Sequence, residues 1–254
     1  MPTPFTHLRY AQRALTDPAL SAAMRAALTR HLPEYLLGSV VADGQGLAGL
    51  RREVTHFYSY DRPLDPLPWV VMLDRHPALR CPSEPAERAF LAAYVFHLAM
   101  DAYWTLNMTG PHFGRDEWAS RSARFLMLHV LLIGMDERDL TALDPALACG
   151  VGEAAPGDWL PFLPLHAVRG WQEVIDRQIR PGGVSETLDV MAPRVGRTPA
   201  ELRALVDDHA EIEASLWRHV PRALLAEREA AMYRFALDAL IEYLEGPQGH
   251  LSRD

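Results

Sequence analysis

Residues 89–104 read AFLAAYVFHLAMDAYW, and this stretch decides the predicted fold class. Nearly every position is apolar except His97 and Asp101, a composition typical of a helix buried in a protein core. Ser83-Glu84-Pro85 precedes it and supplies the acidic and proline residues that open helices, so we expect a helix from about Pro85 to Trp104. The four-residue spacing then places His97 and Asp101 on one face of that helix.

Helix signals also occur upstream of this segment, and strand signals are scarce. Asp17-Pro18 opens an Ala/Leu-rich stretch and predicts a helix through Leu32, with Asp17 as the N-cap. The apolar run from Trp69 to Leu73 follows a proline-rich stretch, and we interpret it as a short helix.

The C-terminal part predicts two more long helices. Thr198-Pro199-Ala200-Glu201 is a capping box, and the helix it opens is expected to run toward His219 before Pro221 ends or kinks it. A last helix is expected from about Arg222 to Leu244.

The domain organisation follows from these helices. Residues 154–164 are rich in Pro and Gly and separate two helical blocks. We therefore predict one all-α domain over residues 1–254, a multi-helix bundle with long loops. It would comprise a metal-site half at about 1–135 and an additional helical part at about 155–247.

Composition narrows the functional classes. The formal net charge of −8 argues against extensive nucleic-acid binding or an anionic-membrane footprint. Cys81 and Cys149 are the only cysteines and are not closely spaced, so neither a disulfide framework nor a thiolate zinc site is expected. The N-terminus shows no secretory-signal pattern and no apolar stretch is long enough for a transmembrane segment, so we expect a cytoplasmic location.

His97 and Asp101 are the strongest chemical signal. An ionised Asp in apolar surroundings is costly unless it is paired or binds a metal ion. His-x-x-x-Asp offers one imidazole nitrogen and one carboxylate oxygen to the same cation. A hydrogen bond that merely satisfies two buried polar groups is the alternative, and the pair alone does not decide between them.

Three more candidates lie upstream of this pair. Asp43 ends the apolar stretch GSVVAD, His56 stands in RREVTHFYSYD, and His7 lies near the N-terminus. Taken singly, they can also be a helix cap, a turn residue and a surface residue. Their presence with His97 and Asp101, among small or apolar neighbours, favours a shared metal site.

The order of the motifs resembles a known family. PFTHLRYAQRAL, GSVVAD, R-x-x-THFY and Y-x-x-HLAMDAYW, over about residues 4–104, resemble the zinc-dependent phospholipase C family, in the branch that includes the N-terminal domain of glycosylphosphatidylinositol-specific phospholipase D. Zinc-dependent single-strand nucleases share that helical fold. Matched motif by motif, the resemblance implies zinc ligands at these positions: His7, Asp43, His56, His97 and Asp101.

The resemblance also implies phosphodiester hydrolysis. Clustered zinc ions clamp phosphate oxygens and lower the pKa of a bound water. Asp43 is then the candidate catalytic residue, as a metal bridge and general base.

The sequence departs from the family pattern after Asp101. The available histidines are His112, in TGPHFGRD, and His129, in RFLMLHVLLIG, but Ile133 stands where a partner carboxylate for His129 is expected. His129 is a candidate metal ligand or a hydrogen-bonded core residue, and His112 a candidate for substrate binding. His209 and Glu213 are a weaker substitute pair, because their neighbours are typical of a solvated helix face. One to three zinc ions are therefore expected.

Further candidates for substrate contact surround His56. Arg51 and Arg52 can bind phosphate, or serve as surface charges or as partners of a ligand carboxylate. Tyr58 can line a substrate cleft or pack the loop. The leading hypothesis is a zinc-dependent hydrolase of a small-molecule or lipid phosphodiester. The rivals are a helical zinc-binding protein without efficient catalysis and a nucleotide or nucleic-acid phosphohydrolase on the same fold.

Overall fold

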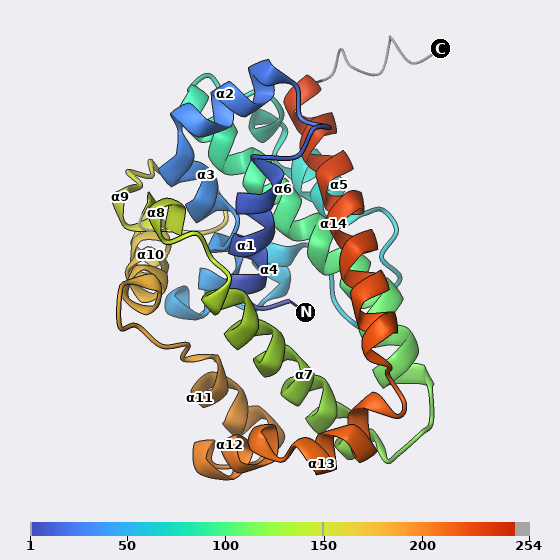
Figure 1. The fold of residues 1–254 in the computed structure, drawn as a ribbon. Coiled ribbons are helices and arrows are strands. Elements are labelled where there is room, and N and C mark those ends of the chain that lie inside the picture. The colour runs from blue at the N-terminus through green and yellow to red at the C-terminus, as the bar shows by residue number, and fades with distance from the viewer. Residues whose placement is uncertain (1, 149, 247–254) are drawn as a thin grey trace.

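The computed structural model describes residues 2–148 and 150–246, and the regular elements in these ranges are helical, with no strand among them (Figure 1). This confirms the predicted all-α class. The α-helices of the first half are α1 (Pro4–Ala14), α2 (Ala22–Arg30), α3 (Leu32–Gly38), α4 (Glu53–His56), α5 (Pro68–Arg75), α6 (Pro85–Trp104) and α7 (Arg121–Thr141). Those of the second half are α8 (Pro145–Ala148), α9 (Gly150–Glu153), α10 (Leu165–Ile179), α11 (Thr187–Met191), α12 (Pro199–Asp207), α13 (His209–Ile212) and α14 (Arg222–Glu245).

Shorter 3-10 and π-helical segments join the α-helices. The 3-10 segments are η1 (Val41–Ala48), η2 (Pro77–Arg80) and η4 (Ala192–Val195). The π-helical segments are η3 (Thr105–Arg115) and η5 (Glu213–Trp217). No helix of the described ranges combines the length and apolar character that crossing a membrane requires.

Helix α6 lies at the centre of the fold and has the predicted bounds. Every residue from Ala89 to Ala102 is buried, which explains why its sequence is apolar on all sides. Helices α14 and α3 pack most extensively against it (Figure 1). His97 and Asp101 are therefore held in the core by packing on several sides of their helix.

Helix α3 approaches α6 closely at a glycine. A Cβ atom at Gly38 would lie only 2.1 Å from the Phe90 carbonyl oxygen, so a larger residue would push the two backbones apart. Ser39 follows directly and is fully buried. This close approach positions the Ser39 carbonyl group beside the polar face of α6.

Ion pairs around the buried Asp139 connect helix α1 to α7 and α7 to α14. The Asp139 carboxylate is fully buried and accepts hydrogen bonds from Arg9 (2.6 Å) and Arg138 (2.8 Å). Arg138 also donates to both carboxylate oxygens of Glu229 (2.5 and 3.1 Å). We call Arg9, Arg138, Asp139 and Glu229 the Asp139 network.

Two predicted helices differ from the structure in their bounds. Helix α2 begins at Ala22, because Ser21 supplies the N-cap by accepting from Met24 N–H, and Asp17 instead holds a turn by accepting from Ala19 N–H. The helix opened by the Thr198 capping box stops at Asp207 instead of reaching His219. Asp208 leaves the helical conformation and caps the next segment through the Glu211 N–H.

Three other predictions of elements are confirmed. The short helix at 69–73 is α5, and the last helix is α14, which ends one residue beyond Leu244. Residues 154–164 contain no regular element. After them, α10 packs against η1, and its Trp171 donates to the Val40 carbonyl group (2.8 Å). The second half of the chain thus supports the segment that carries Asp43.

Candidate metal centre

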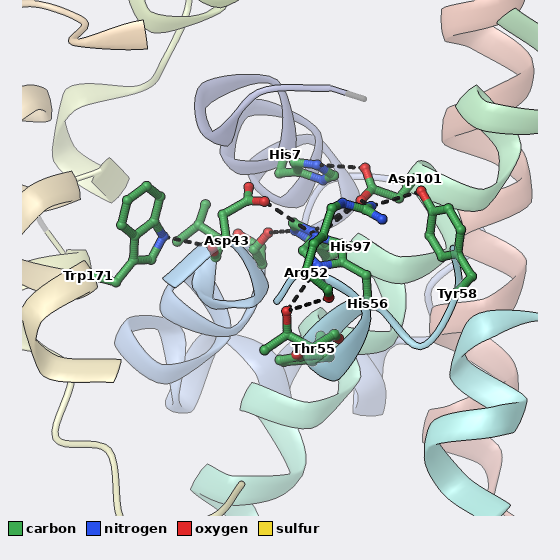
Figure 2. Close-up of polar contacts among 12 residues, drawn as sticks. His7, Asp43, Arg52, Thr55, His56, Tyr58, His97, Asp101 and Trp171 are labelled. Atoms are coloured by element: carbon green, nitrogen blue, oxygen red, sulfur yellow. Dashed lines mark hydrogen bonds and ion pairs between the residues drawn. The ribbon is translucent and has the colours of Figure 1, made fainter. Parts of the chain in front are cut away.

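Five predicted ligands come together in one cluster (Figure 2). They come from four elements, with His7 on α1, Asp43 on η1, His56 on α4, and His97 and Asp101 on α6. All but Asp43 are fully buried. We call these five residues the His/Asp cluster.

Asp101 is the hub of the cluster. Its Oδ1 atom lies 3.4 Å from His7 Nε2, and its Oδ2 atom lies 3.4 Å from His56 Nε2 and 3.6 Å from His97 Nε2. The two carboxylate oxygens therefore face different histidines. This arrangement allows Asp101 to ligate one cation or to bridge two.

Asp43 lies beside His56 in the cluster. Its Oδ1 atom lies 3.3 Å from His56 Nε2, and His56 Nε2 lies 3.4 Å from His97 Nε2. Two groups result, His7–His97–Asp101 and Asp43–His56–His97, and within each group the ligand atoms lie within 4.8 Å of one another. Both groups combine imidazole nitrogens with a carboxylate oxygen, which suits zinc and related ions.

The outer hydrogen bonds of two histidines orient the ligand atoms. His97 Nδ1 donates to the Ser39 carbonyl oxygen (2.8 Å), so the lone pair lies on Nε2. The Thr55 hydroxyl donates to the Arg52 carbonyl oxygen, so its oxygen accepts from His56 Nδ1 (3.0 Å). Metal-binding histidines are typically held in this way by a donor bond from the other nitrogen.

The result is a concentration of acceptors. In the neutral tautomers, the Nε2 lone pairs of His56 and His97 face each other at 3.4 Å and both face carboxylate oxygens. Neither ring nitrogen of His7 makes a hydrogen bond, although the ring is fully buried and stacks on His97 at 3.8 Å. Buried acceptors without donors are costly, and a cation held by either group would give the acceptor atoms of that group a partner.

The pKa values reflect this crowding. Burial, together with the Arg52 cation, lowers the pKa of His56 to about 4. Burial also acts to lower the pKa of His97, but the Asp101 carboxylate outweighs it and the pKa lies above its usual value. Burial opposes ionisation of Asp101, yet His97 and His7 hold its pKa well below the usual range. Without a metal ion, a proton on His97 would add to Arg52 the second positive charge that balances the two carboxylates.

Arg52 lies beside the cluster and contacts Tyr58, which was predicted to bind substrate. Its Nη2 atom donates to Asp101 Oδ2 (3.0 Å) and to the Tyr58 hydroxyl group (2.8 Å), which also pairs with Thr105 (3.0 Å). The guanidinium carbon lies 4.4 Å from the centroid of the Tyr58 ring. Arg52 is thus a partner of a candidate ligand carboxylate, one of the roles that the sequence left open.

The cluster approaches solvent at two side chains. Asp43 is 18% exposed and Arg52 is 20% exposed. Gly44 follows Asp43 and packs so closely on Trp171 that a Cβ atom would lie 2.9 Å from the Trp171 Cβ. Phe57, directly after His56, adopts φ 60°, a conformation that is strained for a phenylalanine. The backbone directly after Asp43 and directly after His56 is therefore tightly constrained.

The remaining candidates lie apart from the cluster. His129 sits on α7, where its Nδ1 donates to the Phe125 carbonyl oxygen of its own helix (2.8 Å), and neither group of candidate ligands includes it. His112 lies in η3 and pairs with the exposed Asp116 (3.2 Å). His209 and Glu213 are exposed, and Glu213 pairs with Arg222.

Sequence reasoning missed the supporting residues Ser39, Thr55 and Trp171. Ser39 lies within the quoted motif GSVVAD, and Thr55 precedes His56. Ser39 acts through its carbonyl group, which every residue possesses, so no side-chain pattern identifies it. Comparisons with protein-family models, curated proteins and solved structures gave no match for this chain. The candidate site is therefore assigned on its own geometry.

Proposed function

We propose that this protein is a zinc-dependent phosphodiester hydrolase of phospholipase C type. The observation that carries the proposal is the His/Asp cluster, in which three histidines and two carboxylates converge with their acceptor atoms inward. A bound zinc ion would supply Lewis acidity toward a phosphate oxygen and would lower the pKa of a bound water.

The cluster supports one or two ions. His97 belongs to both candidate groups, but its Nδ1 is engaged by Ser39, so only Nε2 is left for a metal. One ion would use Nε2 of His97 with either group. Two ions would share Asp101, whose Oδ1 faces His7 and whose Oδ2 faces His56 and His97. The described residues offer no further group of three candidate ligands.

Asp43 and Arg52, the two partly exposed residues at the site, fit the remaining roles in hydrolysis. Asp43 combines partial exposure with a pKa below its usual range, because bonding to His56 and the nearby His97 outweigh the effect of burial. It is therefore ionised at neutral pH and is placed to take a proton from an attacking water. Arg52 reaches both Asp101 and the solvent-facing side, which suits it to a phosphate oxygen.

Charge balance favours an anionic substrate. Asp43 and Asp101 carry two negative charges, Arg52 carries one positive charge, and a divalent ion adds two, which leaves a net charge of about +1 in a low-dielectric site. A phosphodiester carries one negative charge, so it would neutralise the site. Lipid and small-molecule diesters both meet this requirement.

The burial of four of the five ligands favours a second candidate function. A closed site can hold helices together without turnover, and structural zinc sites are typically closed in this way. The helices that the cluster connects, α1 and α6, belong to the core. A metal-binding protein without catalysis is therefore the principal rival.

A substrate panel with matched variants separates these functions. Zinc-loaded protein would be assayed with bis(p-nitrophenyl) phosphate, phosphatidylcholine vesicles, a dinucleotide and single-stranded DNA, before and after chelation. We expect zinc-dependent hydrolysis of diesters that is lost in Asp43→Asn and kept in Asp74→Asn, a control on an exposed carboxylate of α5. Bound zinc without hydrolysis of any substrate would support the structural rival, and hydrolysis confined to nucleotides would support the nucleotide phosphohydrolase.

A further inference from the structure

A second site lies away from the His/Asp cluster, between α7 and α14. In Figure 1 these two helices come closer together toward the lower end of the molecule, where α12 and α13 lie. A pocket of about 400 Å³ lies there, a size typical of small-molecule sites. Its walls are mainly apolar and include Leu131, Met135, Ile212, Leu216, Trp217 and Leu225.

The charged groups of this pocket are already neutralised. Arg138 pairs with Glu229 through two hydrogen bonds and with Asp139 through a third. Arg222, at the rim, pairs with Glu213 (2.5 Å). An ionic ligand would have to break one of these pairs or enter without a counter-charge, whereas an uncharged ligand leaves both pairs intact.

Gly134 leaves open space at the pocket lining. It lies inside α7, lines the pocket and is exposed. Glycine destabilises a helix interior relative to alanine, yet a Cβ atom at this position would meet no protein atom within 4 Å. No close contact with the described residues therefore requires a glycine here. The absence of a side chain leaves the α7 backbone accessible from the pocket.

Another part of the pocket lining departs from regular α-helix geometry. Leu216 and Trp217 belong to the π-helical segment η5, which follows the break at Asp208. Such segments are irregular and often occur at functional sites. Part of the pocket lining is thus formed by a segment that is not a regular α-helix.

We propose that this pocket binds an uncharged, largely apolar small molecule that packs against the α7 backbone at Gly134. The proposal does not depend on the function of the His/Asp cluster, because the two sites share no residue. The paired charges and the apolar walls favour an uncharged, apolar ligand, and the open space at Gly134 gives it room beside α7.

Fluorescence titration with N-phenyl-1-naphthylamine, an uncharged apolar fluorophore, tests the proposal on the full chain. We expect saturable binding at one molecule per chain. Gly134→Leu and Ala226→Leu each add a side chain at the lining from opposite walls, and each is expected to weaken binding by about tenfold or more. Ala223→Leu is the matched control, because Ala223 is exposed on α14 and does not line the pocket.

Gly134→Ala gives an independent readout. It should raise the unfolding temperature of the ligand-free protein, because alanine favours the helix and its Cβ atom meets no neighbour. It should also weaken binding of the fluorophore. Failure of the wild type to bind the fluorophore, or equal binding by Gly134→Leu, Ala226→Leu and Ala223→Leu, would overturn the proposal.

Discussion

The His/Asp cluster and the Asp139 network are both groups of charged side chains around a fully buried aspartate, but they differ in charge balance. The Asp139 network sets two arginines against two carboxylates, and the arginines donate to both acids. The His/Asp cluster sets two carboxylates against one arginine, Arg52. Its other members are histidines, whose acceptor nitrogens face the same carboxylates.

This difference separates a structural ion-pair network from a ligand site. Burying charged groups costs desolvation free energy. In a network whose charges cancel, the ion pairs within the chain offset that cost. The His/Asp cluster lacks one positive charge when its histidines are neutral, so it must take up a proton or a cation. We infer that the Asp139 network connects helices α1, α7 and α14, whereas the His/Asp cluster is built to accept a metal ion.

The largest expected contrast comes from truncating one carboxylate in each region. Asp101→Ala should lower zinc affinity by more than about 100-fold, since even the loss of an outer partner of a ligand costs about 10- to 100-fold. Asp139→Ala should leave zinc affinity unchanged. It should instead lower the free energy of unfolding by about 2 to 3 kcal/mol, because two half-exposed arginines lose their shared partner.

Isothermal titration with zinc and urea unfolding of both variants measure this contrast. The distinction between the two regions fails if Asp139→Ala loses zinc affinity as severely as Asp101→Ala. It also fails if Asp101→Ala keeps the wild-type affinity.

The pH dependence of metal-free stability gives the next contrast. The pKa of His56 is about 4 in the folded protein against 6.5 when unperturbed, so below about pH 6.5 the unfolded chain binds a proton that the folded protein excludes. Stability should fall as pH decreases toward 4, by about 3 kcal/mol in total for this group. The pKa of His97 is raised, so stability should also fall as pH rises above 6.5 through that value.

Urea unfolding of chelated protein across this pH range should therefore show maximum stability near pH 6.5. His56→Gln should reduce the slope on the acidic side, where buried His7 with its lowered pKa still contributes, and leave the alkaline side. A wild-type profile that rises steadily from pH 6.5 to 8 would contradict the protonation of His97 described above.

The smallest expected effect concerns a residue that orients a ligand. Thr55→Val keeps the shape of the side chain but removes the hydroxyl that accepts from His56 Nδ1. Zinc affinity should fall by about tenfold, as is usual when an outer partner of a histidine ligand is lost. Thr141→Val is a suitable control, because the Thr141 hydroxyl only donates to the Glu137 carbonyl group of its own helix. Equal zinc affinities of the two variants would remove Thr55 from the account of the site.

The sequence predicted those parts of the fold that depend on local signals. Helix α6 has its predicted bounds because Pro85 opens it and its continuous apolar run must be buried. The helix from Thr198 was predicted too long, because Asp208 competes as a cap for the following segment. That competition is decided by local hydrogen bonds that the apolar pattern does not encode.

In the candidate site, too, features set by local spacing were predictable and features set by tertiary packing were not. The spacing of His97 and Asp101 on one helix is local, so their common face was predictable. The approach of Asp43 and His56 depends on how η1 packs on α6 and how α4 packs on η1, and motif order alone suggested it. The apolar neighbours of His129 suit a metal ligand or a core residue equally well, and its absence from both groups of candidate ligands depends on tertiary packing.

The most direct test of the central claim is the zinc stoichiometry of the purified protein, measured by elemental analysis and by titration after chelation. The account predicts one or two tightly bound zinc-class ions per chain in the wild type. It predicts loss of that metal in His97→Ala, while His129→Ala keeps it, because His129 lies outside both candidate groups. A wild-type protein that binds no such ion, or a His97→Ala variant with unchanged metal content, would contradict the claim.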